Sequence, residues 1–353
     1  MKKAGIYDPY LDTLGGGERY MMTAAECLLE KNWQVDIFWN HPEISSRIKD
    51  RLGINLNRVN FVEDIFYSKK NLLERIKITQ KYDLIFYLSD GSVPFLFAKK
   101  NILHFQVPFH GIGGKGLLNK IKLKSIDEVV CNSRFTKKFI DKEYGVKSKV
   151  IYPPVAVEEF KPSKKNNIIL SVGRFSRLMQ AKRQDVLVDT FGQMAENLSD
   201  WQLILAGGTD VGKDKAFDAL KKKARNLPVK IIENPSFSEL KKLYAQAKIF
   251  WAATGFGVEE NRKPEKVEHF GITTVEAMAA GCVPLVIAKG GQKEIVNHGV
   301  NGFLWQKKEE LMKLTQQLIK DDQFLRKLSL EAIKKSKIFS RGRFCEEFSS
   351  LVF

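Results

Sequence analysis

Residues 268–281, EHFGITTVEAMAAG, are the densest group in the sequence that could carry out chemistry. Glu268 and Glu276 are separated by seven residues, and Gly271 and two threonines lie between them at the expected start of a helix. Helix N-terminal N–H groups and threonine hydroxyls can bind phosphate, and carboxylates accept hydrogen bonds from ligand hydroxyl groups. The spacing therefore indicates a site for one elongated polar ligand. Paired glutamates on an ordinary charged surface are the alternative interpretation.

A glycine-rich turn, Gly15, Gly16 and Gly17, follows the first expected strand and opens an apolar-faced helix. Glycine lets backbone N–H groups approach a phosphate closely, and the positive end of the helix dipole favours an anion. Tyr20 stands where a Gly-x-Gly-x-x-Gly motif requires glycine, and no Gly-Lys-Ser/Thr follows. A tight turn without a ligand is the alternative.

Four bases follow the strand expected at 168–172. Arg174 and Lys182 lie beyond its carboxyl end, where arginine can hold two phosphate oxygens and lysine adds a positive charge. This combination suits a diphosphate leaving group. For Arg177 and Arg183 we favour a solvated surface position.

His104 lies near the end of the strand expected at 102–105, and His110 follows in a short loop. A single histidine is more often a structural residue than a catalytic one, so both interpretations stay open.

The sequence offers no evident metal site. It contains no Asp-x-Asp, and its four cysteines are scattered without a Cys-x-x-Cys spacing. The cysteines therefore predict buried free thiols, as in a reducing compartment, rather than a disulfide framework or a zinc site.

Short apolar runs alternate with longer segments of helical period, which is typical of a parallel sheet covered by helices. The pattern restarts after a linker at 153–166, so we expect two doubly wound α/β domains over 1–160 and 161–338. The ligand should lie in a cleft at the carboxyl ends of strands. Residues 339–353 have the spacing of an amphipathic helix. The expected strands are 3–7, 34–39, 84–88, 102–105, 128–131 and 150–151, then 168–172, 203–206, 230–232, 249–251 and 283–287.

The formal charge of +17, from 58 Lys and Arg against 41 Asp and Glu, indicates an anionic partner. The excess is densest over 115–149, where ten bases stand among four acids. A solvated face, an anionic membrane surface and nucleic acid are the open interpretations. No apolar run is long enough to span a bilayer, and the N-terminus does not read as a signal peptide. We therefore expect a chain that is neither exported nor integral to a membrane.

Taken together, these segments resemble the GT-B-fold nucleotide-sugar glycosyltransferases, in particular the retaining family-4 enzymes. The resemblance covers the chain from about Lys3 to beyond Phe303. It implies two Rossmann-like domains that face each other across a cleft, with the C-terminal helix crossing back to the first domain. The segments that carry the resemblance are Glu268-x7-Glu276, GGQKEIV at 290–296, NSRFT at 132–136, YPPV at 152–155 and GGGER at 15–19.

The resemblance also assigns roles at the donor diphosphate. Gly16 and Gly17 would approach it from the first domain, and Arg174 and Lys182 would neutralise it from the second. Lys182 departs from the usual pattern because Arg183 follows it where many members have glycine.

Other roles concern the sugar and the ribose. Glu268 would bind the donor sugar and Glu276 the ribose hydroxyls. His104 would face the sugar and stabilise positive charge that develops there, with His110 as the rival. Backbone N–H groups would come to the sugar and phosphates from Phe270, Gly271, Ile272, Thr273 and Thr274.

The activity implied is transfer of a hexose from a nucleotide diphosphate sugar to a glycan or lipid-linked acceptor, with retained configuration and without a metal or other cofactor. The segments 15–19 and 268–272 are similar to those of mannosyltransferases of lipid-linked oligosaccharide assembly, which favours GDP-mannose. A nucleotide-sugar 2-epimerase of the same fold and a non-enzymatic polyanion-binding protein are the alternatives. We expect no nucleic-acid partner, and a cytoplasmic location that is peripheral to a membrane if the acceptor is lipid-linked.

Overall fold

The computed structural model describes residues 1–67, 71–175, 180–198, 200–209 and 215–352. The chain divides into two units, one formed by Met1–Pro154 with Arg341–Phe353 and the other by Val155–Ser340. The boundaries expected from the sequence were 160/161 and 338/339.

In the first unit, the described residues form a seven-stranded parallel sheet in the order β3-β2-β1-β4-β5-β6-β7. Every residue of β4 is buried, as expected for a central strand with helices on both faces. The strands are β1 (Lys3–Tyr7), β2 (Gln34–Phe38), β3 (Val59–Val62), β4 (Leu84–Leu88), β5 (Lys100–Phe105), β6 (Glu128–Cys131) and β7 (Lys149–Val150). The helices are α1 (Gly16–Glu30), α2 (Ile44–Leu52), α3 (Leu72–Thr79), α4 (Leu117–Leu123), α5 (Arg134–Tyr144) and α13 (Arg341–Val352).

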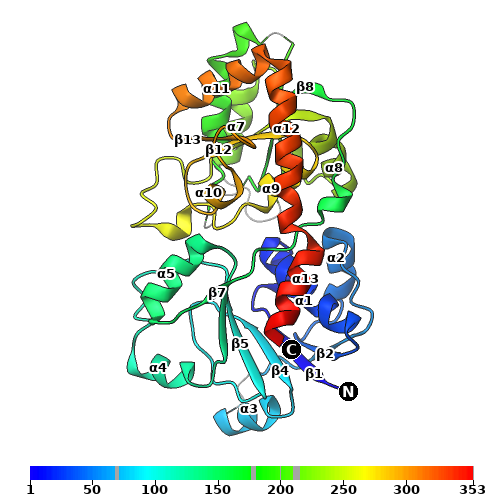
Figure 1. Cartoon of the computed structure of the whole chain (residues 1–353), viewed down its shortest axis with the longest axis vertical. Coiled ribbons are helices and arrows are strands. Elements are labelled where there is room, and N and C mark those ends of the chain that lie inside the picture. Colours follow the sequence, from blue (N-terminus) through cyan, green and yellow to red (C-terminus); the bar gives the residue numbers. More distant parts are fainter. Residues whose placement is uncertain (68–70, 176–179, 199, 210–214, 353) are drawn as a thin grey trace. The chain divides into compact units, whose positions relative to one another are not determined.

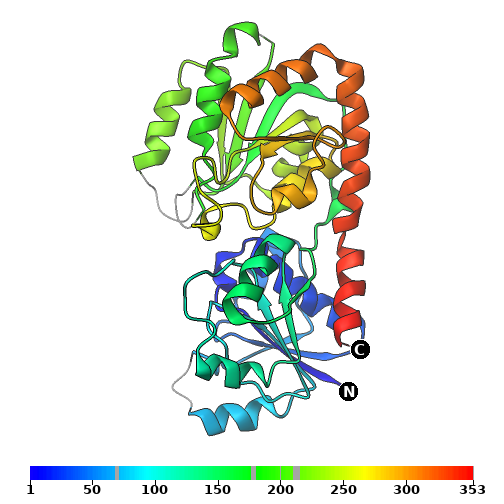
Figure 2. The ribbon, with the colours of Figure 1, turned by 60° about the vertical axis from the view of Figure 1, so that its left-hand side comes forward.

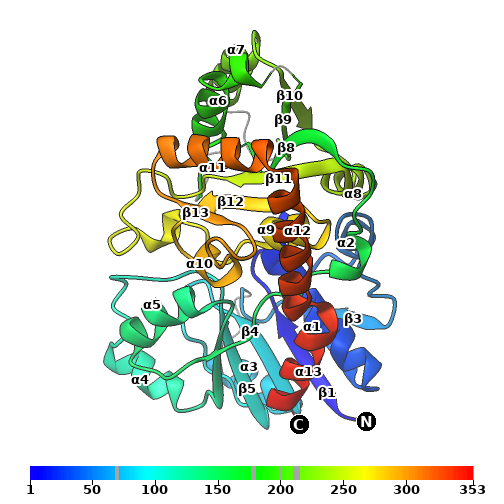
Figure 3. The same cartoon turned by 45° about the horizontal axis from the view of Figure 1, so that its top comes forward.

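The C-terminal helix α13 belongs to this first unit. It packs beside α1 (Figures 1 and 3), and its Phe344 and Phe348 join the core that contains Tyr20 and Phe86. The expectation that the last helix returns to the first domain is confirmed.

The second unit repeats the architecture with a parallel sheet in the order β10-β9-β8-β11-β12-β13. In Figure 2, α11 and α12 are the orange to red-orange helices that flank this sheet, and Figure 3 shows α9 beside α12 and β12. The strands are β8 (Asn166–Val172), β9 (Gln202–Gly207), β10 (Val229–Glu233), β11 (Ala247–Ala252), β12 (Val283–Ile287) and β13 (Phe303–Trp305). The helices are α6 (Gln184–Gly192), α7 (Lys215–Ala224), α8 (Phe237–Gln246), α9 (Ile272–Ala279), α10 (Gln292–Ile295), α11 (Lys308–Lys320) and α12 (Asp322–Ser336).

The cysteine prediction is half right. Cys131 and Cys282 are buried free thiols. Cys27 of α1 and Cys345 of α13, however, form a disulfide with their Cα atoms 5.5 Å apart. The expectation of four free thiols was wrong because the fold brings together two helices that are 318 residues apart in the sequence.

Among the described residues, no helix combines the length and the apolar character that a membrane span requires.

Candidate active site

The segment 268–271 leads directly into α9, the helix that carries Glu276. Gly271 has a φ of +121°, a conformation that favours glycine. Thr274 already donates its N–H to the Gly271 carbonyl at 3.0 Å. Thr274 is therefore already used within the turn, whereas Ile272 and Thr273 lie at the start of α9, where an α-helix leaves its first N–H groups without an intrahelical partner.

Two buried polar atoms near the same helix start have no hydrogen-bond partner within the described part of the chain. They are Thr274 Oγ1 and Gln292 Oε1. A Cβ atom on Gly271 would lie only 3.0 Å from Gln292 Nε2, so the Gln292 amide lies directly against the turn. Buried polar groups are normally paired, and these two atoms mark the start of α9 as suited to a further polar group.

Gly290 and Gly291 fix the position of segment 268–271 by close backbone contacts. Gly291 donates its N–H to the Glu268 carbonyl at 2.8 Å. A Cβ on Gly290 would lie 2.0 Å from that same carbonyl oxygen, and a Cβ on Gly291 would lie 2.4 Å from the His269 carbonyl. Only glycine permits this backbone-to-backbone contact, which explains the Gly-Gly pair in the sequence.

Glu268 and Lys182 form an ion pair with 2.7 Å between Oε2 and Nζ. Their side chains are 14% and 19% exposed, so the pair is largely shielded from water. Burial raises the pKa of Glu268, but the charge and hydrogen bond of Lys182 lower it more, and the net shift is downward. Glu268 is therefore a carboxylate at neutral pH. The pair brings together two predicted site residues that are 86 positions apart.

Glu276 is held by a residue that the sequence analysis did not single out. Tyr244 of α8 donates its hydroxyl to Glu276 Oε2 at 2.9 Å. Burial and the nearby Glu276 charge raise the pKa of Tyr244, so the phenol stays a donor. A buried tyrosine on a helix needs a partner for its hydroxyl, which is the signal that could have indicated this contact.

Lys165 links α8 and α9, the two helices that carry the contact between Tyr244 and Glu276. Its Nζ donates to the carbonyls of Ala247 at 2.8 Å and Ala280 at 2.6 Å, at the C-terminal ends of α8 and α9. A cation is favoured at helix C-termini. Lys165 thus holds α8 and α9 in the register that places Tyr244 against Glu276.

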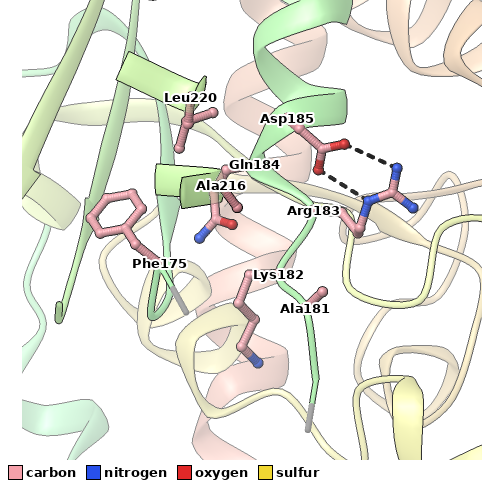
Figure 4. A pocket seen from close by; sticks show the side chains of 8 residues that line it. All are labelled: Phe175, Ala181, Lys182, Arg183, Gln184, Asp185, Ala216 and Leu220. Carbon is pink, nitrogen blue, oxygen red and sulfur yellow. Dashed lines mark hydrogen bonds and ion pairs between the residues drawn. The ribbon is translucent and has the colours of Figure 1, made fainter. Parts of the chain in front are cut away.

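A pocket with a volume of about 320 Å³ lies beside Lys182 at the start of α6. Figure 4 shows the side chains that line it. Arg183 is not a free cation there, because its guanidinium binds both carboxylate oxygens of Asp185 at 3.0 Å and the Phe256 carbonyl at 2.8 Å. Arg183 thus keeps a partly solvated position, with 33% of its side chain exposed, and also has structural partners. The lining residues are Phe175, Ala181, Lys182, Arg183, Gln184, Asp185, Ala216 and Leu220.

Arg174 follows β8 and is exposed. It forms no ion pair with any residue that the structure describes. Gln184 fixes its backbone by donating to the Arg174 carbonyl at 3.0 Å. Arg174 and Lys182 thus both lie beyond the carboxyl end of β8, whereas Arg177 is outside the described residues.

His104 does not have the exposed position that a sugar-facing residue needs. Its side chain is fully buried, with Nδ1 3.1 Å from the Val130 carbonyl and its ring stacked on Tyr20 at 4.1 Å. Burial lowers the pKa of His104 to about 3, so the ring is neutral. In the first unit α1 covers this side chain, which argues against the expected contact with a sugar. The rival, His110, is exposed.

Gln106 reaches the glycine-rich turn instead. Its Nε2 donates to the Gly17 carbonyl at 3.1 Å, and a Cβ on Gly17 would lie 2.4 Å from Gln106 Oε1. Gly16 is the first residue of α1, and Glu18 accepts the Gly15 N–H. The need for glycine at position 17 is therefore explained by the Gln106 side chain. Gln106 was missed, although a polar residue just beyond a strand's carboxyl end is a signal for it.

No group of three or more His, Cys, Asp or Glu side chains in the described part of the chain is arranged to hold a metal ion.

Replacing Tyr244 with phenylalanine tests whether Glu276 is preorganised. We expect Tyr244→Phe to weaken nucleotide-diphosphate binding about two- to tenfold, because one net hydrogen bond contributes about 0.5–1.5 kcal/mol. Isothermal titration of the nucleotide diphosphate measures this, with Glu276→Ala as the larger loss and the exposed Tyr67→Phe as the matched control. A lower melting temperature with unchanged affinity would make Tyr244 a purely structural residue.

The comparisons with known proteins agree with this architecture. The family model of glycosyl transferases group 1 matches residues 156–335, and that of Glycosyltransferase Family 4 matches residues 14–159. An uncharacterized glycosyltransferase of Haemophilus influenzae is 24% identical over 100% of both chains. The GDP-Man:Man(3)GlcNAc(2)-PP-Dol alpha-1,2-mannosyltransferase of Dictyostelium discoideum is 27% identical over 59% of this chain and 42% of that protein. The crystal structure of HepE from Anabaena in complex with UDP is similar in fold, with a TM-score of 0.79 and 19% identity over 99% of each chain. The chain belongs to the group 1 glycosyl transferases and is a GT-B-fold glycosyltransferase.

Proposed function

We propose that this glycosyltransferase moves a hexose, with mannose from GDP-mannose as the first candidate, to a glycan or lipid-linked acceptor with retained anomeric configuration. The observation that carries the donor assignment is the Lys182–Glu268 pair beside the N-terminus of α9. The mannosyltransferase relative supports mannose, whereas HepE, whose structure contains UDP, makes uridine nucleotides the comparison to test.

Different residues bind different parts of the donor. Lys182 Nζ has three N–H donors and Glu268 accepts one of them, which leaves others for a phosphate oxygen. The exposed Arg174 adds a second positive charge for the leaving diphosphate. Glu276, fixed by Tyr244, accepts hydrogen bonds from the ribose hydroxyls, and Glu268 accepts from the sugar.

The proposed reaction is attack from the same face from which the nucleotide leaves. The acceptor oxygen bonds to the anomeric carbon as the bond to the phosphate oxygen breaks, and the departing phosphate takes the acceptor proton. Charge then grows on the diphosphate, so Lys182 and Arg174 stabilise the transition state more than the bound substrate.

The transfer is proposed to need no divalent cation, since Lys182 and Arg174 supply the positive charge. We expect turnover to persist in excess EDTA. Loss of turnover that magnesium or manganese restores would overturn the metal-free proposal and leave the donor assignment untouched.

The function is tested with a thermal-shift panel of GDP-mannose, UDP-glucose, UDP-N-acetylglucosamine and the free nucleotides. A donor at a hundred times its dissociation constant adds about 2.7 kcal/mol to the free energy of unfolding. The stabilising donor is then incubated with lipid-linked and free glycan acceptors, and proton NMR of the product reports its anomeric configuration. Inversion of configuration at carbon 2 of the donor sugar in the absence of an acceptor would instead show that the protein is a nucleotide-sugar 2-epimerase.

We also propose that the protein acts in the cytoplasm, peripheral to an anionic membrane surface where a lipid-linked acceptor is present.

A further inference from the structure

The helix α4 (Leu117–Leu123) presents apolar side chains to solvent. Leu117 is 77% exposed, Leu118 58% and Ile121 49%, and Ile112 in the preceding loop is 47% exposed. None of the residues of α4 is fully buried, and only Leu123, on the opposite side of the helix, packs against the unit's core. A cluster of this kind is unlike the single exposed apolar residues that are normal on protein surfaces.

Two phenylalanines extend this apolar face. Phe95 and Phe97 stack with ring centroids 6.4 Å apart, whereas Leu96 between them is fully buried and anchors the segment. Lys122 lies over the Phe95 ring, with Nζ 5.4 Å from its centroid, and so links α4 to the phenylalanines. We call Phe95, Phe97, Ile112, Leu117, Leu118 and Ile121 the α4 face.

The loop that precedes α4 is built into place. The Glu143 carboxylate of α5 accepts the backbone N–H groups of Gly111 at 2.9 Å, Ile112 at 3.0 Å and Gly114 at 3.1 Å. Ile112 is therefore held in its exposed position by three hydrogen bonds to one buttressing side chain.

Lysines border the α4 face on both sides. Helical spacing places Lys122 on one side of the leucines and Lys120 and Lys124 on the other. These three lysines and Lys115 form no ion pair with the residues that the structure describes. The nearby acids have internal partners: Asp141 pairs with Lys137, Glu128 pairs with Lys149, and Glu143 holds the loop. The α4 face therefore keeps a net positive border, with four lysines against the carboxylates of Asp127 and Glu143, which accept backbone N–H groups.

We propose that the α4 face docks on an anionic lipid bilayer, with Leu117, Leu118 and Ile121 in the acyl boundary and the bordering lysines at the headgroups. Exposed leucine, isoleucine and phenylalanine between lysines are the composition that interfacial helices use. A second copy of this chain would bring like charges together, and nucleic acid would give the leucines nothing to bind. The inference extends the membrane part of the proposed function and does not depend on the donor.

The test is sedimentation of the full-length protein with vesicles of phosphatidylcholine alone or with a third phosphatidylserine. We expect pelleting only with the anionic vesicles and release by salt. Leu117→Ser with Leu118→Ser should lower the vesicle affinity at least about tenfold, and Lys120→Glu with Lys124→Glu by more than about tenfold, because each basic charge contributes about fivefold.

Matched controls come from the second unit. Leu330 is 67% exposed on α12, so Leu330→Ser repeats the apolar change, and Lys327→Glu with Lys334→Glu repeats the charge reversal. Both should pellet as the wild type does, and all variants should keep the wild-type melting temperature and nucleotide affinity. Recovery of the wild type in the supernatant overturns the proposal, as does undiminished pelleting of the Leu117 and Leu118 variant. A concentration-dependent dimer that this variant abolishes, without vesicle binding, would assign the α4 face to a second copy.

Discussion

Lys182→Ala is expected to lower kcat/KM for the nucleotide-sugar donor by about 10²- to 10³-fold, the range found when one preorganised group is removed from a developing charge. Lys182 Nζ lies 2.7 Å from Glu268 Oε2. Its removal deletes a cation that the leaving diphosphate needs, and it also leaves the Glu268 carboxylate facing the phosphate. Most of the loss should be in kcat, because the negative charge on the leaving group grows in the transition state. Steady-state kinetics with the donor found by thermal shift measure both constants.

Two further variants separate catalysis from folding. Arg326→Ala removes an exposed base that pairs with Asp322 in the same unit, and it should leave kcat unchanged. Lys182→Met combined with Glu268→Gln removes both charges, so it should restore the melting temperature lost in Lys182→Ala but not the turnover. Wild-type kcat in Lys182→Ala would rule out the proposed role of Lys182.

The sequence predicted the central strands well because their apolar runs are long and bounded by turn residues. β3 (Val59–Val62) and β13 (Phe303–Trp305) were missed. Both lie at sheet edges and are short, and β3 has no fully buried residue. An edge strand needs fewer apolar residues, so β3 has a weak pattern, whereas the three apolar residues of β13 are too few to show a period.

Within the candidate site, the sequence indicated the residues carried by one local segment but not the contact that holds Glu276. Glu268, Gly271 and Glu276 lie on a single loop and helix, so their spacing alone indicates a shared site. Tyr244 contributes through α8, and its contact with Glu276 spans 32 residues. No periodicity in the sequence specifies that contact. It depends on how α8 and α9 lie against each other, and Lys165 binds the C-terminal ends of both helices.

His104 and Gln106 explain why the end of a strand is difficult to interpret from sequence. Both side chains lie on the α1 side of the sheet, since residues two apart on a strand share a face. The His104 ring stacks on the ring of Tyr20 beneath α1, whereas the Gln106 side chain contacts Gly17 in the first turn of α1. Two residues advance the chain by about 7 Å, which is the difference between a covered side chain and one at the sheet edge. The sequence places the strand but not the depth to which α1 covers it.

The burial of His104 predicts acid sensitivity. Its pKa in the folded protein is about 3, against about 6.5 in an unfolded chain. Below about pH 6.5 the unfolded state binds a proton that the folded state does not, so the stability provided by the neutral ring is complete above that pH and is lost as the pH falls towards 3. The loss amounts to about 4–5 kcal/mol at the acid end, at 1.36 kcal/mol for each unit of pKa difference.

His104→Phe keeps a ring beside Tyr20 and removes the titrating group. Urea unfolding of the wild type and the variant from neutral pH to about pH 4 should therefore show the wild type losing about 3 kcal/mol more than the variant. His41→Ala, a change at an exposed histidine of the same unit, should retain the wild-type pH dependence. Since α1 covers the His104 ring, turnover of His104→Phe at neutral pH should stay within a few-fold of wild type. The same dependence of unfolding free energy on pH in wild type and His104→Phe would contradict this prediction. A large loss of turnover in His104→Phe would in addition support a contact between His104 and the reacting sugar.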